Sequence, residues 1–314
     1  MDAVDWEILQ LFDEGNPRGL ARAISRAESG GGADLMRALH PRTGKAMTIG
    51  LTGPPGVGKS TLAAALVRIA RGQGRRVGVI SVDPSSPFSH GAILGDRIRL
   101  TEHFTDAEVF IRSMASRGHL GGLAGAAGDA IAFMEAFGKE VVFIETVGVG
   151  QSEAEIAELA DAVVVVLQPG SGDSVQLLKA GVLEIADIFV VNKIDHPKAL
   201  ELQRDIRFML ETSSFSGWTP PLVATKAHEG SGIDELWRAI ADHDAYLHAS
   251  GEFERRRRRA FAHRVRLLAL GTIGRRLDRE IAEQLAQYRG ESGDPYDVAE
   301  RITERALLPP YPAA

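Results

Sequence analysis

Six short apolar runs, most of them continuous and separated by stretches of helical periodicity, constrain the fold of this chain more than any other feature of its sequence. Runs without polar alternation are typical of strands buried on both faces of a parallel sheet. Strands that alternate with helices predict the α/β class, a doubly wound and mostly parallel sheet. The six runs are Met47–Leu51, Val77–Val82, Val141–Ile144, Val163–Leu167, Ile188–Val191 and Pro221–Ala224.

Helical segments flank this alternating region on both sides. Before it, apolar residues recur at helical spacing and are interrupted at Gly15-Asn16-Pro17. After it, Glu252–Arg289 has one long helical pattern, whose apolar stripe from Phe261 to Leu285 is expected to form a dimer interface or to cover the core. We expect an N-terminal helical extension over 1–44, an α/β domain over 45–248 and a helical dimerisation region over 249–314.

Composition excludes several classes of protein. The 314 residues contain no cysteine, which excludes a disulfide scaffold, a thiolate metal site and a cysteine nucleophile. The net charge of −6 gives no support for nucleic-acid binding. No apolar run approaches the roughly 20 residues that cross a bilayer, and the acidic N-terminus does not resemble a secretory signal. We therefore expect a cytoplasmic protein with neither a nucleic-acid nor a membrane partner.

A glycine-rich loop between the first strand and the next helix predicts a phosphate site. The segment Gly53-Pro54-Pro55-Gly56-Val57-Gly58-Lys59-Ser60 fits the pattern G-x-x-x-x-G-K-[ST], and Thr61 continues into the helix. Such glycines let backbone N–H groups surround an anion, and the helix adds its positive N-terminal end. Lys59 is expected to reach the β- and γ-phosphates, and Ser60 to bind Mg²⁺. The alternative is a glycine-rich turn without a ligand, but a chance match has a probability of about one per cent.

Two carboxylates are candidates for completing the metal site. Asp83 ends the second apolar run and Glu145 ends the third. Ligands of open parallel sheets bind at the carboxyl ends of the strands. Because Mg²⁺ needs few protein ligands and keeps its waters, either residue could bind it directly or through water. Each could also be an ordinary surface charge.

The segment Asn192-Lys193-Ile194-Asp195 follows the fifth run and fits the pattern N-K-x-D. The Asp195 carboxylate is expected to accept hydrogen bonds from guanine N1–H and the 2-amino group. Adenine offers no such pair and would leave the carboxylate unsatisfied. Backbone N–H groups after the sixth run are expected to contact the guanine oxygen; the residues are Ala224, Thr225 and Lys226. The sequence thus favours GTP over ATP.

Several longer motifs resemble the MeaB/ArgK-type P-loop GTPases, from about residue 10 to about residue 290. They are Val82–Ser86 with Gly91–Arg97, Phe110–Arg112 with Arg117–Gly122, Glu145–Glu153, and Pro169–Asp173. The resemblance implies a GTPase that uses GTP/GDP and Mg²⁺ and that gates adenosylcobalamin loading of an acyl-CoA mutase, methylmalonyl-CoA mutase above all, and protects or rescues that enzyme. An adenosyltransferase is a further implied partner, and a homodimer is implied.

The same resemblance assigns roles to individual positions. Lys59 and Ser60 take the phosphate-loop roles, Asp83, Asp96 and Glu145 match the acidic metal-site positions, and Asp173 and Lys179 fall in a switch segment that links nucleotide state to the mutase. On these grounds the catalytic candidates are Lys59, Asp83, Glu145 and Lys179. Ser113–Ser116 lacks prolines seen in many members, which indicates a subgroup and leaves the mutase open.

The residue after Gly148 predicts slow intrinsic hydrolysis. Many small GTPases place a water-orienting glutamine there, whereas this chain has Val149, which cannot orient water. Orienting groups or an arginine finger can contribute about 10³–10⁵ in rate, so a partner is expected to complete the catalytic geometry. Candidate charges within the chain are Arg97, Arg99, Arg112 and Arg117.

Other interpretations remain open at this point. A metal-insertion GTPase of the urease or hydrogenase type would be expected to carry Cys/His clusters, and the sequence shows none. A P-loop kinase acting on a protein or small molecule is disfavoured by Asn192–Asp195. The cluster Arg255–Arg259 is interpreted as a solvated helix face or a surface for an acidic partner, ahead of a nucleic-acid or lipid patch.

Overall fold

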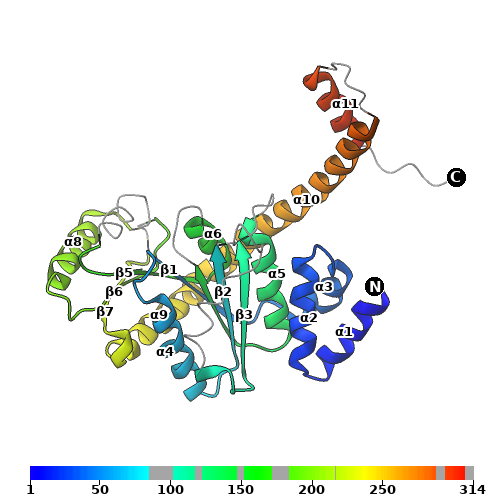
Figure 1. Cartoon of the computed structure of the whole chain (residues 1–314). Helices are drawn as coiled ribbons and strands as arrows, with labels where there is room; N and C mark the ends of the chain where they lie inside the picture. Colours follow the sequence, from blue (N-terminus) through cyan, green and yellow to red (C-terminus); the bar gives the residue numbers. More distant parts are fainter. Residues whose placement is uncertain are drawn as a thin grey trace.

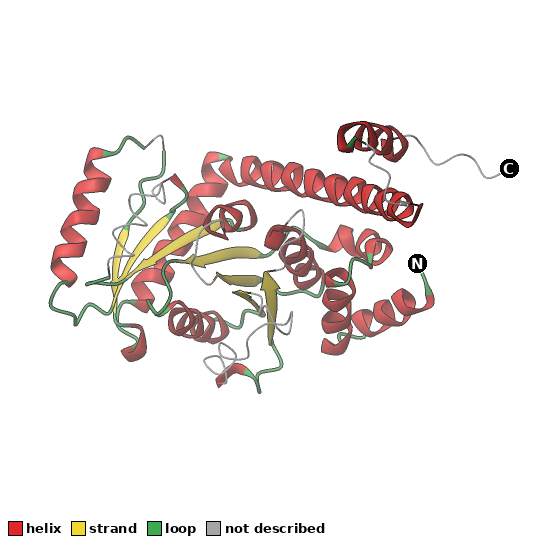
Figure 2. Cartoon of the chain, turned by 45° about the horizontal axis from the view of Figure 1, so that its top comes forward, coloured by secondary structure: helices red, strands yellow, loops and turns green. Residues whose placement is uncertain are grey.

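A parallel seven-stranded sheet forms the centre of the molecule (Figures 1 and 2). The computed structural model describes residues 1–84, 102–116, 122–146, 152–171, 184–215, 217–287 and 294–307. The strand order is β3-β2-β4-β1-β5-β6-β7, and every pair in it is parallel. The strands are β1 Met47–Thr52, β2 Val77–Pro84, β3 Val109–Ser116, β4 Val141–Thr146, β5 Ala162–Leu167, β6 Ile188–Asn192 and β7 Leu222–Thr225.

Helices cover both faces of this sheet, as the doubly wound class predicts. One apolar core lies between the sheet and α4 and α9, and the other lies between the sheet and α5, α6, α8 and the N-terminal helices. The α/β class is therefore confirmed. The helices are α1 Ala3–Asp13, α2 Pro17–Glu28, α3 Ala33–Leu39, α4 Lys59–Gly72, α5 Gly122–Ala136, α6 Ser152–Leu159, α8 Ala199–Thr212, α9 Ile233–Ser250, α10 Glu252–Gln287 and α11 Pro295–Leu307, with 3₁₀ turns η1 His40–Arg42 and η4 Ala227–Glu229.

All six predicted strands are present, and the structure adds β3, which the apolar runs did not reveal. β3 lies at the edge of the sheet and pairs only with β2. Its residues from Val109 to Ser113 are only partly buried, and Arg112 and Ser113 interrupt its apolar character. An edge strand of this kind lacks the continuous apolar run that marks a central parallel strand.

The N-terminal helices form a compact group beside α5 (Figure 1). Asn16 accepts a hydrogen bond from Arg18 N and so caps α2, and Pro17 occupies its first turn, where a missing N–H costs nothing. Phe12 makes edge-to-face contacts with Phe133 and Phe137. The predicted helical break at Gly15–Pro17 is thus a tight connection between two packed helices.

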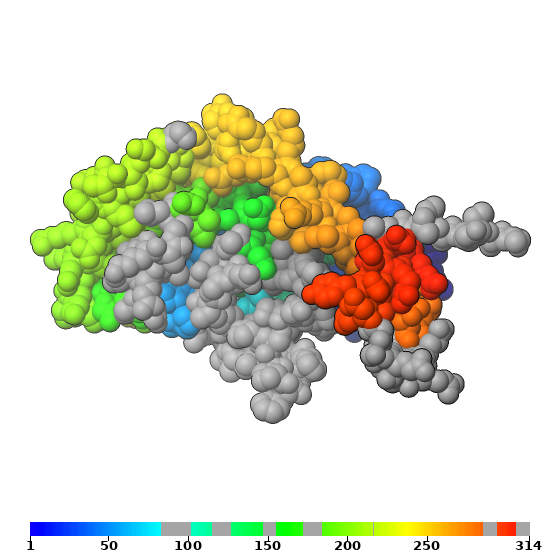
Figure 3. Space-filling view, turned by 90° about the horizontal axis from the view of Figure 1, so that it is seen from above, coloured from blue at the N-terminus to red at the C-terminus, as the bar shows by residue number. Residues whose placement is uncertain are grey.

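The 36-residue helix α10 follows α9 almost directly, since only Gly251 separates them, and it confirms the long helical pattern. It packs against α5, α6 and α9, and its second half stands out beside the α/β domain together with α11 (Figures 1 and 3). The predicted apolar stripe is open to solvent at Phe261, Val265 and Leu268, whose exposed fractions are 61%, 48% and 55%. Among the described helices, none combines the length and apolarity that a membrane span needs.

The interpretation of Arg255–Arg259 as one solvated face is wrong. Arg255 and Arg259 are exposed and pair with Glu252 on their own helix. Arg256 and Arg257 instead reach under the sheet, where they bind the buried carboxylates Asp187 and Asp161. The helical period therefore divides the cluster into three exposed arginines, Arg255, Arg258 and Arg259, and a pair, Arg256 and Arg257, that anchors α10.

Candidate nucleotide site

The phosphate loop connects β1 to α4 and depends on two of its glycines. Gly53 has a φ of 141°, and a Cβ there would lie 2.0 Å from Val166 O. Gly58 has a φ of 99°, and a Cβ there would lie 2.4 Å from Asn192 Nδ2. Only glycine tolerates both the left-handed backbone and these approaches. The loop thus fits tightly between β5 and the end of β6 and leads into the positive N-terminal end of α4.

Lys59 begins α4, and its side chain folds back over the loop. Its Nζ donates to Gly53 O at 2.7 Å and to Pro54 O at 2.9 Å, and the residue is 5% exposed. The ammonium group is therefore held against the loop backbone. This is the place that the phosphate-loop pattern predicts for a lysine that neutralises phosphate charge. Thr61 follows in the first turn of α4, and Val57 is fully buried beneath the loop.

Ser60, in the first turn of α4, meets Glu145 near the carboxyl end of β4. β1 and β4 are paired in register, so that Leu51 lies beside Glu145. Ser60 Oγ donates to Glu145 Oε1 at 2.5 Å, and both side chains are buried. A hydroxyl and a carboxylate at the carboxyl edge of a sheet are donors that Mg²⁺ prefers, so these residues fit a magnesium ion beside the phosphate loop. The predicted proximity of Ser60 and Glu145 is present in the structure.

Other predicted residues around the phosphates are described only in part. The backbone of Asp83 lies at the carboxyl end of β2, paired with Ala115 of β3, and its side chain is outside the description. Asp96, Asp173 and Lys179 lie outside the described residues, as do Arg97, Arg99, Arg117, Gly148 and Val149. Arg112 is described and forms an ion pair with Glu28 of α2. That pairing directs Arg112 toward the N-terminal helices.

Asn192 joins the phosphate loop to the loop after β7. Its Nδ2 donates to Val57 O at 2.8 Å. Its Oδ1 accepts from Thr225 Oγ1 and from Ala227 N, both at 3.1 Å. The side chain is buried and makes hydrogen bonds through both its amide nitrogen and its amide oxygen, so it fixes the distance between two parts of the predicted site that are far apart in sequence. Ala224 and Thr225 pair with β6 directly beside it.

Lys193 makes a second link, through a partner that the sequence analysis did not identify. It has a φ of 60°, and its Nζ donates to Gly56 O at 2.8 Å and to Gln168 Oε1 at 2.6 Å. A non-glycine residue in this region costs roughly 1–3 kcal/mol and needs surrounding contacts to hold it. Gln168 follows β5 directly, and its position at the carboxyl end of a predicted strand was the available signal.

Asp195 lies at the open side of this arrangement. Its side chain is 52% exposed, and its Oδ2 lies 3.8 Å from Lys226 Nζ. The hydrogen bond that Lys226 Nζ donates to Glu229, with the charge of Asp195 beside it, raises the pKa of Lys226. The backbone N–H of Lys226 donates to Ser231 O within its own loop. The carboxylate of Asp195 is thus accessible to a base that enters beside Lys193.

Comparison with known proteins identifies the family. A family model described as methylmalonyl-CoA mutase-associated GTPase MeaB matches residues 20–281. The chain belongs to the MeaB family. GTPase ArgK of Escherichia coli is 37% identical, over 79% of this chain and 78% of ArgK. A Pyrococcus horikoshii protein whose name proposes that it is a GTPase is 42% identical, over 98% of this chain and 99% of its own length.

Two further similarities extend the comparison of this MeaB-family chain. The mouse mitochondrial methylmalonic aciduria type A homolog is 36% identical, over 68% of this chain and 53% of its own length. A solved structure of a LAO/AO transport system kinase superposes with a TM-score of 0.70 at 27% identity, covering 98% of this chain and 99% of that one. The family resemblance drawn from the motifs is confirmed.

Proposed function

We propose that this MeaB-family protein binds GTP with Mg²⁺ and hydrolyses it to GDP and phosphate. One observation carries the proposal. Asn192, the first residue of the guanine motif, bonds to Val57 in the phosphate loop and to Ala227 after β7, at the sheet edge where Ser60 and Glu145 meet. Phosphate, metal and base determinants that are far apart in sequence therefore face one region. The names of the relatives agree with this activity.

The residues of the chain have distinct tasks in this proposal. The loop N–H groups and Lys59 bind the β- and γ-phosphates and stabilise negative charge as it shifts toward the leaving oxygen. Ser60 and Glu145 hold Mg²⁺, which when bound neutralises charge between the two phosphates. Asp195 selects the base, and Lys193 keeps the base loop against Gly56. Val149 supplies no water-orienting group, so we expect slow hydrolysis until a partner binds.

We propose an acyl-CoA mutase that depends on cobalamin as that partner. The family description names methylmalonyl-CoA mutase, and the mouse relative is named for methylmalonic aciduria. In this proposal the nucleotide state gates adenosylcobalamin loading and protects or reactivates the mutase, with an adenosyltransferase as a further partner. The protein acts as a homodimer in the cytoplasm.

Two measurements test the proposal. We expect a cobalamin-dependent mutase to bind the protein in only one of two states, with GDP or with a non-hydrolysable GTP analogue. We also expect the mutase to accelerate single-turnover GTP hydrolysis. A mutase that binds equally in both states and leaves the single-turnover rate unchanged would contradict the chaperone role, while the GTPase activity would stand.

A kinase is the second candidate, because the superposed solved structure is named a transport system kinase. The contacts of Asn192 and Lys193 favour a guanine-specific site, which P-loop kinases do not require. Transfer of labelled phosphate to an added protein or small molecule, instead of to water, would favour the kinase. Release of inorganic phosphate alone would favour the GTPase.

A further inference from the structure

Three buried carboxylates hold the starts of strands at the sheet edge opposite the nucleotide site. Asp161 Oδ2 accepts from Thr48 N of β1 at 2.9 Å. Asp187 Oδ2 accepts from Val163 N of β5 at 2.9 Å. Glu135 accepts from the backbone just before β1, at Gly44 N and Ala46 N. All three carboxylates are at least 93% buried.

Two consecutive arginines of α10 neutralise these carboxylates. Arg256 forms a bidentate pair with Asp187, with distances of 2.8 and 2.7 Å, and also donates to Asp161 O at 2.8 Å. Arg257 donates to Asp161 Oδ2 and Ala46 O, both at 2.7 Å, and to Glu135 at 3.3 Å. The planar guanidinium group holds several N–H donors in a fixed fork, which suits such multiple contacts. A lysine in its place offers only a point charge.

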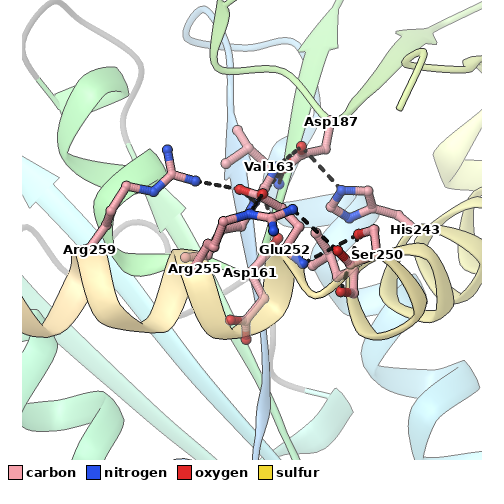
Figure 4. Close-up of polar contacts among 10 residues, drawn as sticks. Asp161, Val163, Asp187, His243, Ser250, Glu252, Arg255 and Arg259 are labelled. Atoms are coloured by element: carbon pink, nitrogen blue, oxygen red, sulfur yellow. Dashed lines mark hydrogen bonds and ion pairs between the residues drawn. The ribbon is translucent and has the colours of Figure 1, made fainter. Parts of the chain in front are cut away.

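His243 of α9 completes the network beside Asp187. It is fully buried, and its Nε2 lies 3.2 Å from Asp187 Oδ1 (Figure 4). Burial by itself raises the pKa of Asp187, but the hydrogen bonds donated by Arg256 and the nearby His243 ring outweigh it and lower the pKa to about 2. Asp187 is therefore ionised at neutral pH and depends on these partners.

The strands that begin in this network end in the nucleotide site. β1 runs six residues to the phosphate loop at Gly53, and β5 runs six residues to Gln168. β6 begins directly after Asp187 and runs five residues to Asn192. β5 and β6 are buried along their whole length, and β1 is buried from its second residue onward. A shift at their starts is transmitted to their carboxyl ends, because close-packed strands move as units.

We propose that Arg256 and Arg257 are positioning residues of the nucleotide site, which act from α10 by fixing the starts of β1, β5 and β6. They set the spacing between the phosphate loop and the guanine motif without touching the nucleotide. The inference rests on the proposed function, because it requires that the chain binds a guanine nucleotide. A purely structural role would lower stability and leave the affinity of the folded protein unchanged.

The test compares lysine substitutions at four positions of the same helix in the full chain. Arg256→Lys and Arg257→Lys keep the charge and lose the fork. Arg255→Lys and Arg259→Lys change exposed residues that pair with Glu252 on the same helix, and Arg255 also donates to Ser250 O. Calorimetry measures the affinity for GDP, and steady-state kinetics with GTP give KM and kcat. Both are measured at a temperature where every variant is folded. Leu20 is a fully buried residue of α2, away from this network. Leu20→Ala therefore serves as a control that lowers stability without changing the network.

We expect Arg256→Lys and Arg257→Lys to weaken GDP binding roughly three- to thirty-fold and to raise KM for GTP. The other two lysine variants and Leu20→Ala are expected to keep the wild-type GDP affinity. Folded Arg256→Lys and Arg257→Lys proteins with unchanged GDP affinity would overturn the inference. Wild-type protein that binds no GDP would contradict the proposed function instead.

A double variant keeps the test decisive if a single variant does not fold. Asp161→Asn combined with Arg257→Gln removes a buried charge of each sign, which is often tolerated where removal of one partner is not. The neutral pair no longer holds β1 to α10 with charge-assisted bonds, so weaker GDP binding is expected. Wild-type GDP affinity in this folded double variant would also overturn the inference.

Discussion

At the scale of single residues, the proposed magnesium role of Ser60 and Glu145 predicts how nucleotide binding depends on the ion. Glu145→Gln removes the charge while keeping the size of the side chain, so GTP affinity should depend less on Mg²⁺. We expect the ratio of GTP dissociation constants without and with Mg²⁺ to fall about tenfold, since a hydrogen bond to a charged group contributes roughly 1.5–3 kcal/mol. Calorimetry in Mg²⁺ and in EDTA measures this ratio.

The matched control for this change is Glu140→Gln. Glu140 is half-buried, directly precedes β4 at the end away from Glu145, and pairs with Arg76. An unchanged magnesium ratio in Glu145→Gln, or an equal change in both variants, would contradict the assignment of Ser60 and Glu145 to the metal.

Gln168 gives a second prediction at this scale. Gln168→Leu removes the acceptor that holds Lys193 Nζ, so the base loop should lose part of its support. We expect GDP affinity to fall by about three- to tenfold, which corresponds to roughly 0.5–1.5 kcal/mol for a lost hydrogen bond. Fluorescence titration with a labelled GDP measures it. Gln10→Leu, on the exposed side of α1, should have no effect; equal affinities in both variants would be evidence against this role for Gln168.

At the scale of elements, the buried network under the sheet makes stability depend on pH. The pKa of Asp187 is about 2 in the folded protein and about 3.8 in the unfolded chain. Its contribution of about 2 kcal/mol is therefore fully present above about pH 4 and lost as the pH falls toward 2. Urea unfolding between pH 5 and pH 2.5 should show a smaller loss of stability in Asp187→Asn than in the wild type. If the unfolding free energy of Asp187→Asn fell with pH as steeply as that of the wild type, the low pKa assigned to Asp187 would be contradicted.

The elements also show which features the sequence could predict. The six central strands were predictable because burial on both faces imposes a continuous apolar run, as at Ala162–Leu167. The phosphate loop was predictable because the backbone conformation of the loop itself requires glycines at fixed positions in the sequence. β3 was missed because an edge strand can carry Arg112, whose partner Glu28 lies 84 residues earlier in the chain.

The arginines of α10 were misjudged for a related reason. Arg255–Arg259 gives no local signal that separates the exposed members from the buried ones. The separation depends on Asp161 and Asp187, which directly precede β5 and β6 and come within reach only after the sheet has formed. Gln168 was missed in the same way, because its contact with Lys193 depends on the pairing of β5 and β6.

At the scale of the whole molecule, the exposed apolar side of α10 predicts a homodimer. Replacing Phe261, Val265 and Leu268 together by glutamine should shift the protein to a monomer, because burial of these side chains is the driving force for association. Analytical ultracentrifugation measures the change. The matched control replaces Ala262, Arg266 and Ala269 by glutamine. These are the exposed positions one residue further along the helix. A dimer that persists in the first variant would overturn the assignment of this face.

These point substitutions are preferable to removal of the whole C-terminal region. A chain cut after Ser250 would lose Arg256 and Arg257, the arginine partners of Asp187 and Asp161. Loss of one partner from a buried ion pair typically costs about 3–5 kcal/mol. A monomer obtained in that way would not distinguish a lost interface from a damaged fold.

The most direct test of the account is the choice of base. Calorimetry measures the dissociation constants of GDP, ADP and xanthosine diphosphate for the wild type and for Asp195→Asn. The wild type should bind GDP at least 100-fold more tightly than ADP. Asp195→Asn should lose GDP affinity and gain affinity for xanthosine diphosphate, because an amide can donate to the 2-oxo group where a carboxylate cannot. Equal binding of ADP and GDP by the wild type would contradict the central claim that a guanine nucleotide occupies this edge of the sheet.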